Sequence, residues 1–274
     1  MQITTRDGVQ LYAKRWGSGR PVILIHGWPL TADTWDDVAL PIAAAGFEVI
    51  AYDRRGFGRS EQPWTGYDYD TFADDLADVL AATNATQATL VGFSMGGGEV
   101  ARYFQRHKGA HVAQAALIGS VVPYLLRTDD NPDGVAASVF ETMQAQITKD
   151  RAAFYATFFK DFYGVGVISR PVSPEVIAWS QQLAMQAGLK ATLDCITAFS
   201  QTDFRPDLAA ISVPTLVIHG TGDAIVPIEP TARVVAAALP NAQVHEYDDA
   251  PHGLLASHKT QVASDLLAFL QTHK

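Results

Sequence analysis

The sequence predicts an α/β fold in which a mostly parallel sheet is flanked by helices on both faces. Short apolar runs alternate with stretches whose apolar residues recur at helical spacing, and neighbouring parallel strands need long crossovers of this kind. The chain has 274 residues, of which 48% are hydrophobic and 18% charged. It is therefore long enough to bury a large core and too apolar to be disordered.

Seven runs are strand candidates and two stretches are helix candidates. Residues 10–16 alternate loosely between polar and apolar side chains, which favours an early edge strand, whereas residues 22–25 are continuously apolar, as in a strand buried on both faces. The other strand candidates are residues 47–52, 88–91, 115–118, 215–218 and, more weakly, 244–247. Apolar residues recur at helical spacing at Phe72, Leu76, Val79 and Leu80, and at Val262, Leu266, Phe269 and Leu270.

One long stretch interrupts this alternation. Residues 121–205 carry little strand signal, many aromatic residues and the helix-interrupting Pro171 and Pro174. We predict that this stretch is a helical lid inserted between two strands, and that residues 1–120 and 206–274 form the core. Most of its aromatic side chains are expected to pack the lid onto the sheet, with a minority facing a pocket.

The composition argues against several classes of protein. A formal net charge of −9 argues against a general nucleic-acid binder, which needs a basic stripe to neutralise phosphates. No apolar run approaches the ~20 residues that span a bilayer. Residues 1–6 also lack the charged stretch followed by an apolar stretch that is typical of a signal peptide. The single cysteine, Cys195, excludes an internal disulfide. We therefore expect a cytoplasmic protein with no nucleic-acid or membrane partner.

The segment Gly92-Phe93-Ser94-Met95-Gly96 carries the strongest functional signal. It follows a buried strand and precedes a helical stretch, the context in which a G-x-S-x-G pattern marks a nucleophilic serine. A tight turn holds such a hydroxyl above the sheet, and side chains in place of the two glycines would collide with the turn. Ser94 could instead only cap the helix, and residues 96–98 could bind phosphate, although no P-loop lysine follows. We predict that Ser94 is the nucleophile.

A serine needs a base, and in this pattern the acid and then the histidine follow the nucleophile along the chain. His252 lies between the last strand candidate and the last helix, where Gly253 gives the loop freedom to aim the imidazole. Asp223 follows a buried strand and two glycines; it would fix the histidine tautomer, or else cap a helix. We predict Asp223 as the acid and His252 as the base. The rival carboxylates are Asp203, Asp248 and Asp249, none of which ends a buried strand so cleanly.

An oxyanion hole needs two N–H donors, one after the nucleophile and one after an early strand. Met95 supplies the first, and Trp28 supplies the second because Pro29 has no N–H. Pro29 also restricts Trp28 towards an extended backbone and so fixes the direction of the Trp28 carbonyl. His26 is expected to be a structural hydrogen-bonding group beneath this loop, and His219 a structural residue at a strand end.

Together these residues resemble the α/β-hydrolase superfamily and, within it, the bacterial arylesterases and cofactor-free haloperoxidases (perhydrolases). The matching motifs are HGWP at 26–29, DRRGFGRS at 53–60, GFSMGGG at 92–98, TDDNP at 128–132, TDFRP at 202–206 and APHG at 250–253. The resemblance implies an eight-stranded sheet, the lid after the sixth strand, a triad of Ser94, Asp223 and His252, and oxyanion donors at Trp28 and Met95. It also implies no metal and no organic cofactor, a structural turn at residues 53–60, and a homo-oligomer of three or more chains.

The expected activity is that of a serine hydrolase acting on small or aryl carboxylic esters through an acyl-enzyme. With hydrogen peroxide and an ester or carboxylic acid, the product is a peracid, which oxidises halide away from the protein; Pro29 favours this reaction because it sets a carbonyl near the incoming peroxide. Phe158, Phe162 and Ile225 are expected to line the acyl pocket. Lactonase, amidase or lactamase activity on the same triad stays open, as does a ligand receptor that keeps the fold.

Overall fold

The computed structural model describes residues 1–272 and contains an eight-stranded sheet with the order β1-β2-β4-β3-β5-β6-β7-β8. The β1–β2 and β2–β4 pairs are antiparallel, whereas the remaining pairs are parallel. The prediction of a mostly parallel α/β sheet is confirmed. The strands are β1 (Gln2–Thr4), β2 (Gln10–Gly17), β3 (Pro21–Ile25), β4 (Glu48–Tyr52), β5 (Ala88–Phe93), β6 (Val112–Ile118), β7 (Thr215–Gly220) and β8 (Gln243–Tyr247).

The N-terminal edge of the sheet differs from the prediction. The sequence indicates an edge strand at residues 10–16, but β2 lies inside the sheet and β1 forms the edge. β1 has three residues, and only Ile3, which lies opposite Leu11 in the register, is buried. Such a short strand shows too little alternation to be recognised from its sequence.

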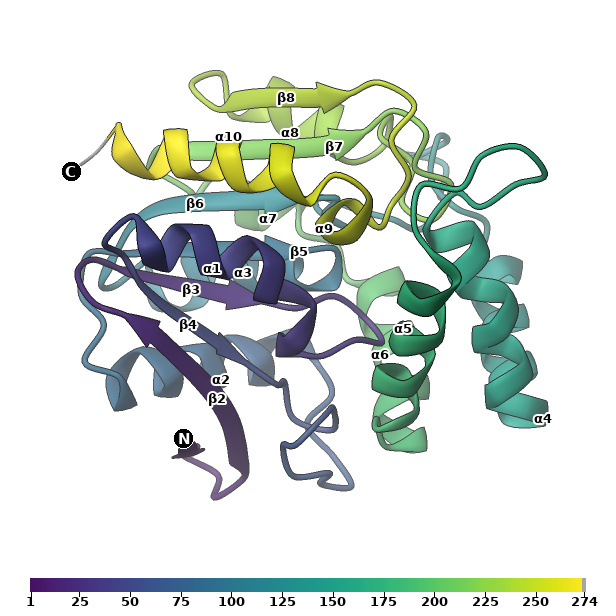
Figure 1. Ribbon diagram of the computed structural model, residues 1–274, viewed down its shortest axis with the longest axis horizontal. Helices are drawn as coiled ribbons and strands as arrows, with labels where there is room; N and C mark the ends of the chain where they lie inside the picture. The colour runs from purple at the N-terminus through teal and green to yellow at the C-terminus, as the bar shows by residue number, and fades with distance from the viewer. Residues whose placement is uncertain (273–274) are drawn as a thin grey trace.

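Helices cover both faces of the sheet (Figure 1). α1 (Asp36–Ala44) and α10 (Lys259–Gln271) lie side by side on one face, and α2 (Tyr69–Ala82) and α3 (Met95–His107) pack together on the other. The apolar residues that predicted α2 and α10 are all buried, as an amphipathic helix on a sheet requires. Short helices complete the connections: η1 (Ala32–Trp35), α7 (Arg205–Leu208), α8 (Ala232–Ala238) and α9 (Leu254–Ser257).

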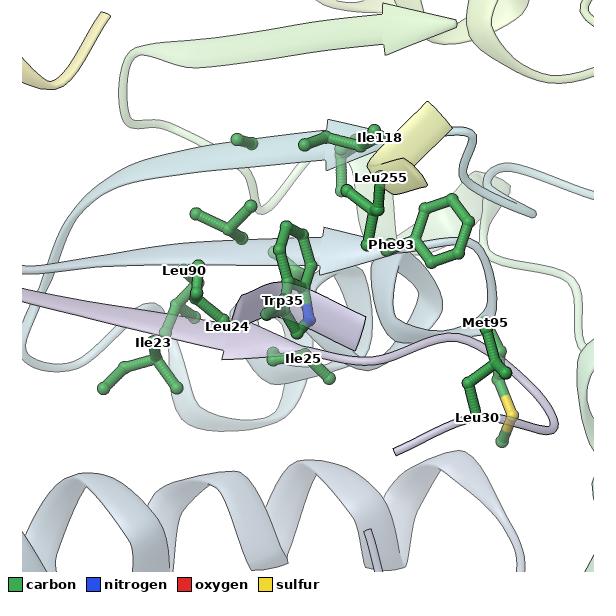
Figure 2. Packing of buried hydrophobic residues seen from close by; sticks show 14 of the residues in the cluster. Ile23, Leu24, Ile25, Leu30, Trp35, Leu90, Phe93, Met95, Ile118 and Leu255 are labelled. Carbon is green, nitrogen blue, oxygen red and sulfur yellow. The ribbon is translucent and has the colours of Figure 1, made fainter. Parts of the chain in front are cut away.

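The central strands β3 and β5 are buried along their whole length. Figure 2 shows Trp35 of η1 over these two strands, and its indole meets the ring of Phe93 edge-on with centroids 6.4 Å apart. Dense packing of this kind leaves the strands little room to move. The loops that follow their carboxyl ends therefore start from fixed positions.

Between β6 and β7 the chain forms the α4–α6 segment, residues 121–205, at the carboxyl ends of the strands (Figure 1). Its long helices are α4 (Ala137–Phe162), α5 (Pro174–Met185) and α6 (Leu189–Gln201). α4 bends at Asp150, where the backbone is extended (φ −160°, ψ 90°). The Asp150 carboxylate accepts a hydrogen bond from the Ala153 N–H at 2.9 Å, so it caps the second half of the helix.

Arg205 joins the two ends of the α4–α6 segment. Its Nη2 lies 3.0 Å from Asp130 Oδ2 and 2.7 Å from Asp203 Oδ2. Its guanidinium also stacks over the ring of Tyr124, 5.0 Å from the centroid. The motifs at 128–132 and 202–206, which are far apart in sequence, therefore meet where the segment leaves and returns to the core.

Candidate active site

Ser94 lies in a sharp turn between β5 and α3. Its backbone angles, φ 55° and ψ −119°, are rare for a residue with a side chain. A Cβ on Gly92 would lie 2.4 Å from the Gly96 carbonyl oxygen, and a Cβ on Gly96 would lie 2.6 Å from that of Ile25. The first collision, within the turn, is the one expected from the sequence, whereas the second is with β3; for both reasons the turn accepts only glycine at these positions.

A chain of hydrogen bonds joins Ser94, His252 and Asp223. His252 Nε2 lies 2.9 Å from Ser94 Oγ, and His252 Nδ1 lies 2.6 Å from Asp223 Oδ2. All three residues are buried. Because the carboxylate can only accept, Nδ1 carries the proton and the Nε2 lone pair faces the serine hydroxyl.

The Asp223 carboxylate is held from several sides. Its Oδ1 accepts hydrogen bonds from the N–H groups of Ile225 and Val226 at 2.9 and 2.8 Å, and His219 Nε2 lies 3.4 Å from Oδ2. Burial alone would raise the pKa of Asp223, but its interactions with His252 and then His219 outweigh burial and hold the pKa well below its usual range. Asp223 is therefore an ionised partner for His252.

The rival carboxylates lie outside this chain of hydrogen bonds. Arg205 binds the Asp203 carboxylate, with Nη2 2.7 Å from Oδ2. Asp248 and Asp249 are exposed in the turn that follows β8. His219, which we expected to be structural, bonds the Val226 carbonyl through Nε2 at 2.9 Å; its closeness to Asp223 was not predicted.

The loop after β3 packs against the N-terminus of α3. A Cβ on Gly27 would lie 2.9 Å from the Cβ of Ser94, so the two backbones are in close contact. Met95 is the first residue of α3, where backbone N–H groups have no partner inside the helix. The indole N–H of Trp28 donates to the Thr192 carbonyl at 3.1 Å, which anchors this side chain to α6. Trp28, Met95 and Ser94 thus come together, and their roles as oxyanion donors and nucleophile stay predictions.

A buried polar network lies beneath this loop; the structural hydrogen-bonding role predicted for His26 is confirmed, whereas the parts of Arg54, Glu99 and Tyr52 were not predicted. His26 Nδ1 donates to the Gly27 carbonyl, and Nε2 accepts from the Arg54 N–H, both at 2.9 Å. Arg54 also donates from Nη2 to the His26 carbonyl and from Nε to Glu99, again at 2.9 Å, and Tyr52 donates its hydroxyl proton to Glu99. Burial first, and then the charge of Arg54, hold the pKa of His26 well below its usual range. The sequence signal was Glu99, a charged residue inside an apolar helix start.

A cavity of about 570 Å³ opens above Ser94 and His252. The ring of Trp28 lines this cavity and packs against Phe154, Phe158 and Phe199 of the α4–α6 segment, with centroids 5.4–6.4 Å apart. Phe154 and Phe199 were not singled out in the sequence, because nothing there distinguishes them from the other aromatic residues of the segment.

Two of the three residues predicted for the pocket, Phe158 and Ile225, line this cavity, whereas Phe162 is not among the residues lining it. The Phe162 ring packs edge-on against His252, with centroids 4.9 Å apart, and against Phe93 at 6.2 Å. Phe162 shares a helix face with Phe158, but it is the last residue of α4. There the helix meets the sheet, so the side chain supports the catalytic histidine candidate instead of contacting the cavity.

Residues 1–272 contain no group of three or more His, Cys, Asp or Glu side chains that could hold a metal ion. Within the same range, no helix is long and apolar enough to cross a membrane. Cys195 is fully buried, and burial raises the pKa of its thiol, which makes it unreactive.

Comparisons with known proteins identify the family of this fold. The family model for the alpha/beta hydrolase fold matches residues 20–259. The bifunctional esterase/perhydrolase of Acinetobacter calcoaceticus is 43% identical over 274 residues, covering 98% of this chain and 99% of that protein. The non-heme chloroperoxidase of Streptomyces lividans is 43% identical over 273 residues, with the same coverage. The crystal structure of a bromoperoxidase from Bacillus anthracis matches with a TM-score of 0.96 and 42% identity, covering 99% of each chain.

Proposed function

The chain belongs to the α/β-hydrolase family, and from this premise we propose that it is a serine hydrolase of small or aryl carboxylic esters that also catalyses perhydrolysis. The observation that carries the proposal is the hydrogen-bond chain from Ser94 through His252 to Asp223. The esterase/perhydrolase and the chloroperoxidase named among its relatives, each 43% identical to it, support the two activities.

In the proposed hydrolysis, His252 Nε2 takes the proton of Ser94 as Oγ attacks the ester carbonyl carbon. The N–H groups of Trp28 and Met95 stabilise the oxyanion. His252 then protonates the leaving alcohol as its C–O bond breaks. Water attacks the acyl-enzyme, gives a proton to His252 and releases the acid, and Ser94 regains its proton.

In the proposed perhydrolysis, hydrogen peroxide replaces water and attacks the acyl-enzyme, so the product is a peracid. When the acyl source is a carboxylic acid, acylation of Ser94 releases water, and the sum is acid plus peroxide giving peracid plus water. The peracid oxidises halide in solution. Pro29 supports this reaction because it fixes the direction of the Trp28 carbonyl beside the position of the incoming peroxide.

The acyl group is proposed to lie in the cavity against Phe158 and Ile225, which suits small or aryl esters. We further propose a cytoplasmic location, supported by the single buried Cys195, which has no cysteine in this chain to pair with. An assembly of three or more chains is proposed from the family resemblance, and the molar mass in solution tests it.

The first experiment compares the wild type with Ser94→Ala on p-nitrophenyl acetate, and then adds peroxide with acetate as the acyl source. Loss of a triad nucleophile is expected to lower kcat by about 10⁴-fold or more. Peracid formed by the wild type alone supports perhydrolysis on the same serine. Equal activity of the two proteins would show that Ser94 is not the nucleophile. Two inert proteins would favour equally the receptor alternative and a hydrolase with a narrower choice of substrate.

A further inference from the structure

The Arg54–Glu99 ion pair connects the two halves of the proposed oxyanion hole. Glu99 belongs to α3, the helix whose first residue is Met95. Arg54 lies just beyond β4, and its guanidinium donates from Nε to Glu99 Oε2 and from Nη2 to the carbonyl of His26, both at 2.9 Å. His26 is two residues before Trp28, so one side chain bonds to both of the segments that supply the donors.

We propose that Arg54 and Glu99 are positioning residues that fix the distance between the Trp28 N–H and the Met95 N–H. The inference rests on the proposed function, because it concerns the oxyanion hole of that reaction. Neither residue lines the cavity above Ser94. Their effect is exerted through the backbone of the loop after β3.

Hydrogen bonds hold the carbonyls of His26 and Gly27 and the imidazole of His26 in the loop. Arg54 binds the His26 carbonyl, the Arg54 N–H binds His26 Nε2, and His26 Nδ1 binds the Gly27 carbonyl. The side chains of Arg54 and Glu99 are 1% and 0% exposed, so water is excluded from these bonds. A displacement of about 1 Å at a catalytic group lowers rates by roughly 10²-fold, which sets the scale of the expected effect.

Stability alone does not account for the placement of this pair. A buried ion pair is weak evidence for stability, since a well-packed apolar replacement is often as stable. What the apolar replacement lacks is the directed hydrogen bond from Arg54 to the His26 carbonyl.

The neighbouring pair Arg55–Asp75 supplies a matched control. Its side chains are 2% and 3% exposed, and its two hydrogen bonds are both 2.6 Å long. Arg55 also bonds Asp7, near the N-terminus, at 2.8 Å. The two pairs thus have the same charges and nearly the same burial, and their arginines are adjacent in the chain. The hydrogen bonds of Arg55, however, run to Asp75 and Asp7 and not to the loop after β3.

The experiment compares Arg54→Met/Glu99→Leu with Arg55→Met/Asp75→Leu in the full chain. A cooperative thermal unfolding transition is the check that each variant is folded. The values of kcat and KM are measured on p-nitrophenyl acetate. Inhibition by phenylboronic acid, which forms a tetrahedral adduct with the serine, reports on the oxyanion hole. In Arg54→Met/Glu99→Leu, kcat is expected to fall by about 10²-fold and the boronic acid to bind more weakly by a similar factor, with KM within about threefold of wild type. Arg55→Met/Asp75→Leu should keep wild-type kcat and inhibition.

Wild-type kcat and inhibition in folded Arg54→Met/Glu99→Leu would overturn the inference, as would equal losses in the two double variants. If Arg54→Met/Glu99→Leu does not fold, the inference is tested with Arg54→Lys instead. Lysine keeps a positive charge opposite Glu99, but it lacks the planar guanidinium that bonds Glu99 and the His26 carbonyl at the same time. We expect kcat to fall about tenfold with KM retained, and a wild-type kcat would overturn the inference. Failure of the proposed function is a different result, namely Ser94→Ala as active as wild type.

Discussion

The floor of the candidate active site and its wall are built on different principles. The floor consists of turns at the carboxyl ends of β3, β5 and β7 and the loop after β8, where segments of the chain approach so closely that glycines such as Gly92, Gly96 and Gly220 leave no room for a Cβ. A Cβ on Gly220, for example, would lie 2.1 Å from the Ala250 carbonyl oxygen. The wall consists of aromatic rings from α4 and α6 around Trp28, whose contacts are broad and apolar.

The difference indicates which property each region controls. In the floor the backbones pack too closely to admit even a Cβ at these glycines, so the floor fixes the geometry of the hydrogen-bond chain and with it kcat. Ring contacts with centroids 5–6 Å apart tolerate exchange of one apolar side chain for another. We therefore expect the floor to control chemistry and the wall to control the choice of substrate.

The largest expected effect comes from the floor. Asp223→Asn keeps the shape of the side chain and an acceptor for the Ile225 and Val226 N–H groups, but it no longer fixes the proton on His252 Nδ1. We expect kcat on p-nitrophenyl acetate to fall by about 10⁴-fold, with KM nearly unchanged. Asp203→Asn is the control, and it should retain wild-type kcat; equal losses in the two variants would contradict the assignment of Asp223.

A smaller and more selective effect is expected from the wall. Phe158→Ala removes a ring that lines the cavity, so kcat/KM on p-nitrophenyl phenylacetate should fall by about 10- to 100-fold. Hydrolysis of p-nitrophenyl acetate, whose acyl group is too small to fill the cavity, should change much less. A uniform loss over both esters would place Phe158 outside the acyl pocket and weaken the distinction between floor and wall.

A substitution at Pro29 tests whether the floor also determines which molecule, water or hydrogen peroxide, attacks the acyl-enzyme. Pro29→Leu removes the restriction on Trp28, so the ratio of perhydrolysis to hydrolysis should fall by about threefold or more. Peracid formation and p-nitrophenyl acetate hydrolysis are measured on the same preparation. An unchanged ratio would remove Pro29 from the proposal and leave the esterase mechanism intact.

The smallest expected effect is on acid stability. Because the pKa of Asp223 is held below its unfolded value of about 3.9, its ionised form contributes stability above that pH, and this contribution is lost as the pH falls towards the folded pKa. The Tm of wild type minus the Tm of Asp223→Asn should therefore shrink by a few degrees from pH 6 to pH 3. A constant difference over this range would contradict the lowered pKa.

Much of the floor could be predicted from the sequence because its signals are local. The turn at Ser94 needs a strand, two glycines and a helix within about a dozen residues, and all are adjacent in the chain. Asp223 and His252 could be chosen because each follows a strand end. The edge strand β1 was missed because three residues carry too little pattern.

The wall could not be predicted in the same way. Phe158 and Phe162 are separated by one helical turn and look equivalent in the sequence, but the end of α4 meets His252 and only Phe158 lines the cavity. Phe199 comes from another helix altogether. Which face of a helix meets the cavity depends on how the helices cross the sheet, and no local pattern records this crossing.

By itself, then, the sequence determined the α/β class and offered Ser94, Asp223 and His252, in that order along the chain, as candidates for nucleophile, acid and base. Each of these predictions depends on a few neighbouring residues. The tertiary structure decided which aromatic rings line the cavity, that His219 approaches Asp223, and that Arg54 rather than Arg55 bonds the loop after β3. The physical reason is that most of these contacts join residues tens to more than a hundred positions apart, or depend on which way adjacent side chains point. Their partners are set by the packing of the whole chain. The His219–Asp223 contact spans only four positions, but it depends on how the turn after β7 is folded.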